Sequence, residues 1–185
     1  PVLNDGYQDD AVEKLGNHKP AGNFRGGKYS LFDAATHVPF FVYWKSNIKH
    51  KESKALVCQM DIMASVAALL NQPLKGTFDS QNILPALLGK SKKGRTELVV
   101  EANAKMALRY KNWAMIPPYK GPQRNETGNE LGNLSDYGLY NLTSDEGQIN
   151  NVATKKPRKL EKLKSVFFDI TKGYYKSKVE EIKLK

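Results

Sequence analysis

The chain has 185 residues, of which 29 are Lys or Arg and 19 are Asp or Glu, and its formal net charge is +10. This length suits one domain, or one domain with an appendage, and the composition excludes the collagenous, coiled-coil and wholly disordered classes. A membrane-spanning helix needs about 18 consecutive apolar residues. No apolar run in this chain approaches that length, so we expect no membrane span. The single cysteine, Cys58, excludes an internal disulfide and a multi-cysteine zinc site.

The positive charge is concentrated near the C-terminus. Residues 155–185 hold 11 Lys or Arg and 4 Asp or Glu, whereas the remainder holds 18 and 15. A basic excess is typical of proteins that bind nucleic acid or another polyanion. Because the excess is confined to one end, we expect a solvated helix face and tail rather than a specific polyanion site.

The first elements in chain order are a loop, a strand and a helix. Glycines and Pro20 predict an irregular, functional loop over residues 17–37. The apolar run at 38–44 predicts a buried strand of a parallel sheet, since it does not alternate. Residues 56–70 have apolar side chains at helical spacing, and the order strand, loop and helix indicates an α/β layer.

A short helix over 83–88 is expected next, with Asp79 or Ser80 as its N-cap and Gly89 at its end. Beyond Lys90 the pattern changes to short strands, expected at 97–102, 105–110, 113–116 and 138–142. Asn103-Ala104 and Lys111-Asn112 are expected to form hairpin turns. An amphipathic helix is expected from Pro157 to just before Gly173.

These elements divide the chain into three predicted segments. Residues 1–89 are interpreted as the C-terminal part of a larger α/β domain, and 90–173 as a small antiparallel sheet with one C-terminal helix. Residues 174–185 form a basic tail. The chain begins at Pro1 without an initiating methionine, so we expect it to be a fragment of a longer protein.

The segment 17–30 carries the most suggestive chemistry. It places four side chains on a glycine-rich backbone: His18, Lys19, Arg25 and Lys28. Glycines allow close approach to a ligand, and cationic side chains bind oxyanions, which favours an anion site. The alternative is a surface turn whose glycines serve only backbone geometry.

No metal site is predicted within the chain. The three histidines, His18, His37 and His50, lack metal-binding spacing, and the aspartates Asp5, Asp9 and Asp10 lack the pattern of a calcium loop. Cys58 has no identifiable histidine partner and is expected to pack rather than react.

The stretch 19–40, with Gly26-Gly27-Lys28, resembles the late region of the formylglycine-dependent sulfatases, the bacterial arylsulfatase type. Three further segments are similar to that family: residues 5–15, residues 56–70, and Leu139-Tyr-Asn-Leu142 followed by Asp145-Glu146. The resemblance covers roughly residues 1–170. It implies an alkaline-phosphatase-like α/β fold, of which this chain would be the C-terminal fragment.

The resemblance also implies a function, the hydrolysis of aryl sulfates or sulfated carbohydrates. Lys28 would contact the sulfate ester, and His18 would contact the leaving alcohol or the sugar. The resemblance implies that the carboxylates that hold calcium lie upstream of this chain. The formylglycine nucleophile would also lie upstream, since no Cys-x-Pro-x-Arg occurs here. The isolated chain is therefore expected to be inactive without the rest of its parent sulfatase, which is expected to be periplasmic or secreted.

Two alternatives stay open. A related hydrolase of the alkaline-phosphatase superfamily would act on phosphate esters, and a nucleophilic Thr or Ser upstream would indicate it. A non-catalytic basic module would bind a polyanion. In Thr36-His37-Val38-Pro39 the chain has His37 where the sulfatase family frequently has arginine. We expect a sulfate-ester substrate and no nucleic-acid partner.

Overall fold

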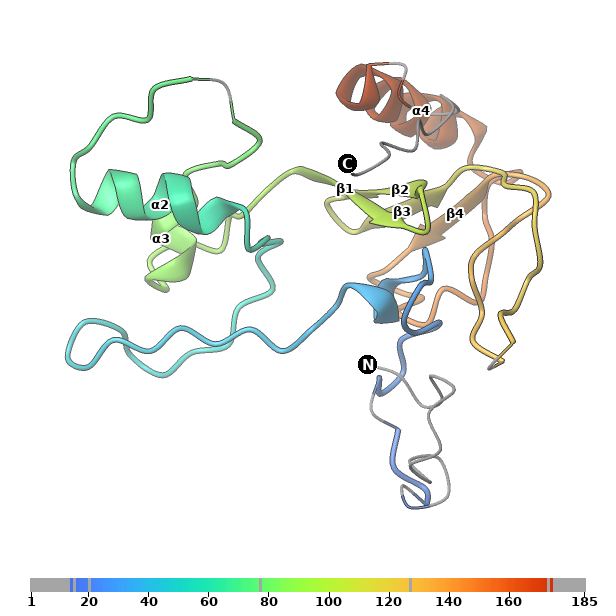
Figure 1. The fold of residues 1–185 in the computed structure, drawn as a ribbon, viewed down its shortest axis with the longest axis horizontal. Helices are drawn as coiled ribbons and strands as arrows, with labels where there is room; N and C mark the ends of the chain where they lie inside the picture. The colour runs from blue at the N-terminus through green and yellow to red at the C-terminus, as the bar shows by residue number, and fades with distance from the viewer. Residues whose placement is uncertain are drawn as a thin grey trace, which may run out of the picture. The chain divides into compact units, whose positions relative to one another are not determined.

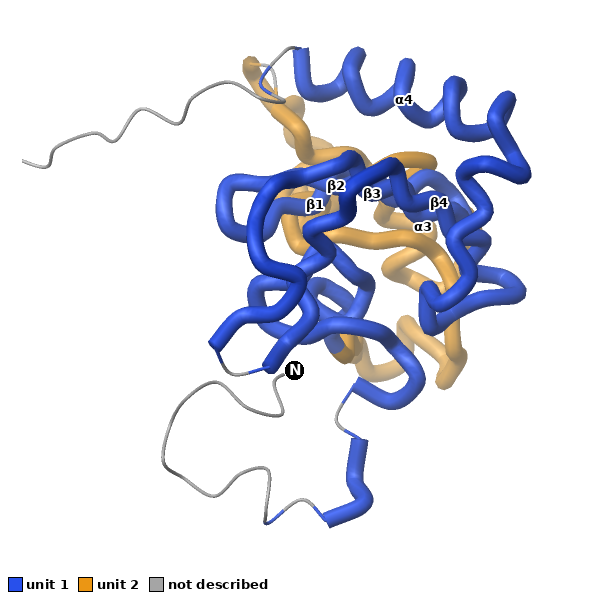
Figure 2. The backbone as a smooth tube through the Cα atoms, turned by 90° about the vertical axis from the view of Figure 1, so that its right-hand side faces the viewer, with its two compact units in different colours: residues 1–38, 99–185 blue, residues 39–98 orange. Residues whose placement is uncertain are grey.

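A computed structural model describes residues 14, 16–19, 21–76, 78–126, 128–172 and 174 of the chain. By its internal contacts the chain divides into two units, residues 1–38 with 99–185, and residues 39–98 (Figure 2). We call them the sheet unit and the helical unit and describe each by itself. No helix among the described residues is both long and apolar enough to cross a membrane.

The sheet unit is built on four strands in the order β1-β2-β3-β4 (Figure 1). The strands are β1 (Glu97–Ala102), β2 (Lys105–Tyr110), β3 (Trp113–Ile116) and β4 (Gly138–Asn141). Asn103 and Ala104 both have left-handed backbones, with φ of 50° and 57°, and this geometry matches the twist of a tight hairpin. The predicted strands and turns are confirmed.

Helix α4 (Pro157–Thr171) covers one face of this sheet. Its Leu163 and Phe167 are fully buried against Leu108, Met115 and Leu139 of the strands. Proline in the first turn is tolerated because its missing N–H has no partner inside the helix. The predicted helix is confirmed, whereas Gly173 and residues 175–185 of the predicted tail lie outside the described residues.

The opposite face of the sheet is covered by the glycine-rich loop itself. Leu31 and Phe32, which precede the short helix η1 (Asp33–Ala35), pack with Ala114, Ile116 and Tyr140. A strand presents alternate side chains to two faces, so the sheet needs a second apolar cover, and this loop supplies it. The loop therefore packs with the sheet.

The helical unit contains α2 (Asp61–Leu69) and α3 (Leu84–Leu87). Helix α2 begins later than the predicted residue 56, because the Asp61 carboxylate accepts the Cys58 amide at 3.2 Å and closes a turn there. Ser80 does not cap α3 as predicted; its Oγ accepts the Ala64 amide, which is one of the first four N–H groups of α2.

Residues 38–44 form no strand, contrary to the prediction. Phe41 and Tyr43 are 90% and 86% exposed. An apolar run becomes a strand only where a neighbouring strand pairs with its backbone groups, and among the described residues none pairs with this run.

Phe167 gives a test of the core between α4 and the sheet. Phe167→Ala is expected to lower the free energy of unfolding by about 3–5 kcal/mol, because it leaves a cavity under α4. Its neighbour Phe168 is 41% exposed, so Phe168→Ala is the matched control and should cost much less. Urea unfolding followed by circular dichroism measures both, and equal losses would contradict this packing.

Candidate functional site

The loop that carries the predicted site residues is held on the sheet unit by Arg25. Its Nε donates to Glu130 Oε2 at 2.6 Å, and its Nη1 donates to the Gln148 carbonyl at 2.8 Å. The guanidinium also lies 4.0 Å from the centroid of the Phe32 ring. Arg25 therefore anchors the loop, and its charge is matched by a carboxylate rather than offered to an anion.

Asp33 forms a second anchor of the loop. Its carboxylate accepts Arg109 Nη1 at 2.9 Å and lies 2.9 Å from His37 Nδ1, while its amide donates to Gln148 Oε1 at 2.7 Å. Gln148 is 1% exposed and has a left-handed backbone, with φ of 51°. Gln148 therefore joins the two anchors, because its backbone carbonyl accepts from Arg25 and its side-chain oxygen accepts from the Asp33 amide.

Sequence reasoning did not identify the groups that receive these anchors: Arg109, Glu130 and Gln148. The Asp145-Glu146-Gly147 turn was the sequence feature that could have drawn attention to Gln148, since it immediately precedes this residue. Asp145 shapes that turn because its carboxylate accepts the amides of Ile149 and Asn150 at 2.9 and 2.8 Å.

Lys28 lies between the two anchors, on a tight turn of the loop. Gly26 has a φ of 86°, and a Cβ there would lie 2.4 Å from Ser30 Oγ, so this position requires glycine. The Ser30 amide donates to the Gly27 carbonyl at 3.1 Å and closes the turn. Lys28 itself is exposed, and its Nζ lies 5.1 Å from the Tyr29 ring centroid.

Tyr29 adds backbone strain at the same turn. It has a φ of 72°, an unfavourable conformation for a residue with a bulky side chain, and it is 47% exposed. Such strain persists only where the surroundings enforce it, and it is common at ligand-binding sites. The anchors on either side of Lys28 provide that enforcement.

The other predicted residue, His18, is exposed near the start of the described chain. Among the described residues no hydrogen bond or ion pair joins it to Lys28, so the structure does not bring the two together. Lys19 is likewise exposed. Asp5, Asp9 and Asp10 lie outside the described residues. Within the described ranges, no group of three or more His, Cys, Asp or Glu side chains is placed to hold a metal ion.

The pair Arg25–Glu130 is also the main electrostatic feature of the loop. Hydrogen bonds from Arg25 lower the pKa of the Glu130 carboxyl, and the same bonds raise the pKa of Arg25. Burial in the sheet raises the pKa of the Tyr140 hydroxyl, which is therefore neutral near Arg25.

This pair predicts a pH dependence of the loop. A carboxyl whose pKa is lowered by folding adds stability above its unfolded pKa of about 4.3 and loses it as pH falls through the folded value. The Arg25 Nε–H signal in a ¹H–¹⁵N spectrum should therefore shift only in this acidic range. Glu130→Gln should abolish the transition, and a transition that persists in this variant would contradict the assignment.

Comparisons with known proteins cover the part of the chain that contains this loop. Residues 7–72 match the family named Sulfatase. The chain is 42% identical over 167 residues to an N-acetylgalactosamine-6-O-sulfatase of Bacteroides thetaiotaomicron, covering 88% of this chain and 33% of that protein. It is 34% identical over 70 residues to an arylsulfatase of Hemicentrotus pulcherrimus, covering 37% of this chain and 13% of that protein.

A solved structure agrees in fold. It comes from work on the metabolism of multiple glycosaminoglycans by Bacteroides thetaiotaomicron. Its TM-score to this chain is 0.89 and its sequence identity is 40%. The match covers 93% of this chain and 37% of the chain in that structure. The chain thus spans about a third of the length of that structure and of the Bacteroides relative. The resemblance predicted from the sequence is confirmed, since the chain matches a C-terminal portion of a sulfatase.

Proposed function

We propose that the protein carrying this chain is a sulfuric ester hydrolase that acts on sulfated carbohydrates, and that Lys28 contacts the sulfate group. The observation that carries this proposal is the placement of Lys28. It is an exposed cation on a strained turn between two anchors, within a segment that matches the sulfatases. The relative's name, an N-acetylgalactosamine-6-O-sulfatase, supports a sulfated amino sugar as the substrate class.

The chemistry follows from the position of the ammonium group. Lys28 Nζ donates to a sulfate oxygen and offsets the negative charge that develops on the leaving alcohol oxygen as the S–O bond breaks. A fixed loop stabilises this charge without reorganising during the reaction, and the Arg25 and Asp33 anchors supply that rigidity. His18 is assigned to the leaving alcohol or the sugar.

The remaining parts of this proposal concern the whole protein. Calcium polarises sulfate oxygens where a site holds it. The described residues contain no cluster of three or more His, Cys, Asp or Glu side chains that could hold a metal ion, so no residue here is assigned to it. A formylglycine nucleophile and a periplasmic or secreted location are likewise supported by the family resemblance alone.

Sulfate release from chondroitin disaccharides tests this function. The full-length protein is expected to release sulfate from N-acetylgalactosamine 6-sulfate faster than from the 4-sulfate isomer. The isolated 185-residue chain serves as a second arm and is expected to release none. Release from neither isomer by the full-length protein would contradict a galactosamine 6-sulfate substrate, and turnover by the isolated chain would contradict the assignment of the nucleophile elsewhere.

A further inference from the structure

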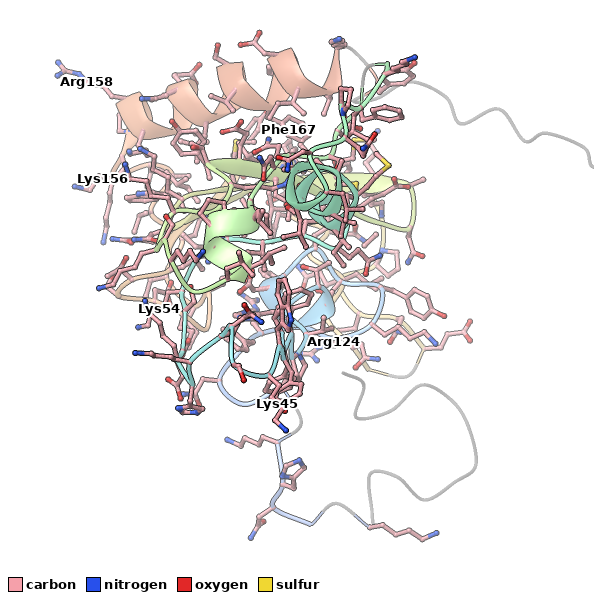
Figure 3. All side chains as sticks on the ribbon, turned by 90° about the vertical axis from the view of Figure 1, so that its left-hand side faces the viewer. Lys45, Lys54, Arg124, Lys156, Arg158 and Phe167 are labelled. Atoms are coloured by element: carbon pink, nitrogen blue, oxygen red, sulfur yellow. The ribbon has the colours of Figure 1, made fainter. Side chains whose placement is uncertain are left out.

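The first half of α4 carries an excess of cations, and no ion pair among the described residues neutralises it. Residues 155–162 hold one acidic residue and five basic residues, which are Lys155, Lys156, Arg158, Lys159 and Lys162. The acid, Glu161, accepts Lys164 Nζ at 2.8 Å and so is already paired. Among the ion pairs of the described residues none involves these five cations, and Lys156 and Arg158 point outward from the helix (Figure 3).

Three ammonium groups at this surface are held close to aromatic rings of the sheet. Lys159 Nζ lies 5.2 Å from the Trp113 ring centroid, and the Nζ atoms of Lys111 and Lys162 both lie 5.9 Å from that of Tyr110. Cation–π attraction reduces the freedom of these long side chains. The charges therefore gather on one surface, which joins α4 to the β2–β3 turn.

This arrangement breaks a local rule of helix stability. The first turn of α4 contains no acidic residue, and basic residues there are repelled by the positive end of the helix dipole. The repulsion adds to that among the cations themselves. A bound polyanion would offset both, so the sequence favours a surface that functions with such a partner rather than one selected for the stability of the helix.

We propose that this cationic surface, formed by Lys111 and the five cations of residues 155–162, binds a chain of sulfated glycan. It lies on the face of the sheet that α4 covers, whereas the loop with Lys28 covers the opposite face. It is therefore a second surface, which would hold a polymeric substrate away from the reacting sulfate. The sulfated class of the polyanion rests on the proposed function.

The aromatic rings favour a glycan over single-stranded nucleic acid. Proteins that bind single strands offer free aromatic faces on which bases stack. Here the rings of Tyr110 and Trp113 are partly buried and already accompanied by ammonium groups. Charge contacts to sulfate groups along a flexible polymer need no such free faces.

The test measures binding of chondroitin 6-sulfate chains to the 185-residue chain by isothermal titration calorimetry at several salt concentrations. Arg158→Gln/Lys162→Gln is expected to weaken binding about tenfold and to reduce the slope of log affinity against log salt by about 2. Lys92→Gln/Lys93→Gln removes the same charge from two exposed lysines of the helical unit and should change neither quantity.

Two results would overturn this proposal. One is equal weakening by the α4 variant and its control, which would indicate attraction to net charge alone. The other is tighter binding of a single-stranded DNA of the same length than of the glycan, which would assign the surface to nucleic acid. Binding should persist in Lys28→Ala, so failure of the proposed sulfatase activity is distinguished from failure of this surface.

Discussion

Replacing Lys28 by alanine should lower kcat/KM for the sulfate ester by about 100- to 1,000-fold in the full-length protein. The reason is that the ammonium group is assigned to charge that grows as the S–O bond breaks, and a single preorganised donor of this kind typically contributes that much. Because Lys28 is exposed, the free energy of unfolding should change little. Steady-state kinetics of sulfate release measures the effect.

The matched control is Lys19→Ala, which removes an exposed lysine from the same loop region. It should retain most of the activity. The loss in Lys28→Ala should fall mainly on kcat, since an interaction that is stronger in the transition state than in the bound substrate lowers kcat. A loss confined to KM would contradict the assigned role and indicate simple substrate binding.

A second large effect is expected at Asp61 in the helical unit. Asp61→Ala should lower the free energy of unfolding by about 3–5 kcal/mol, because it leaves the Arg95 guanidinium buried without its carboxylate. Asp61 is fully buried and accepts Arg95 Nη2 at 2.6 Å and the Gln81 amide at 2.9 Å. Arg95 also donates to the Asp79 carbonyl, so the pair ties α2 to the segment before α3.

Chemical denaturation of the chain measures this loss, with Asp79→Ala as the control because the Asp79 side chain is exposed. The double variant Asp61→Leu/Arg95→Met should recover much of the stability, since replacing both buried charges removes the desolvation penalty. If the double variant is as unstable as Asp61→Ala, the stability contributed by Asp61 comes mainly from the backbone amides that its carboxylate accepts, and not from its pairing with Arg95.

The sequence predicted the sheet unit well because its pattern is local. The alternation within 105–110 and the helical spacing of Leu160, Leu163 and Phe167 each follow from neighbours in the chain. The cover on the second face of the sheet was not predictable in this way. Leu31 and Phe32 follow a glycine-rich stretch without periodicity, and only the fold shows that they reach Tyr140.

The site was predicted in part for a similar reason. Composition grouped Arg25 with Lys28 as two equivalent cations, because both lie on the same glycine-rich loop. The structure separates them, since Arg25 is bound by Glu130, which lies 105 residues away in the chain. The role of Gln148 was missed because a neutral side chain gives no charge pattern. The strand expected at 38–44 failed because pairing depends on a partner strand, which the run itself does not specify.

The measurement that tests the central claim most directly compares two substrates that differ in one group. The full-length protein is given N-acetylgalactosamine 6-sulfate and N-acetylgalactosamine 6-phosphate, and the released inorganic anion is quantified by ion chromatography. We predict that kcat/KM for the sulfate ester exceeds that for the phosphate ester. A higher value for the phosphate ester would contradict the sulfatase assignment and favour a phosphoester hydrolase on the same fold.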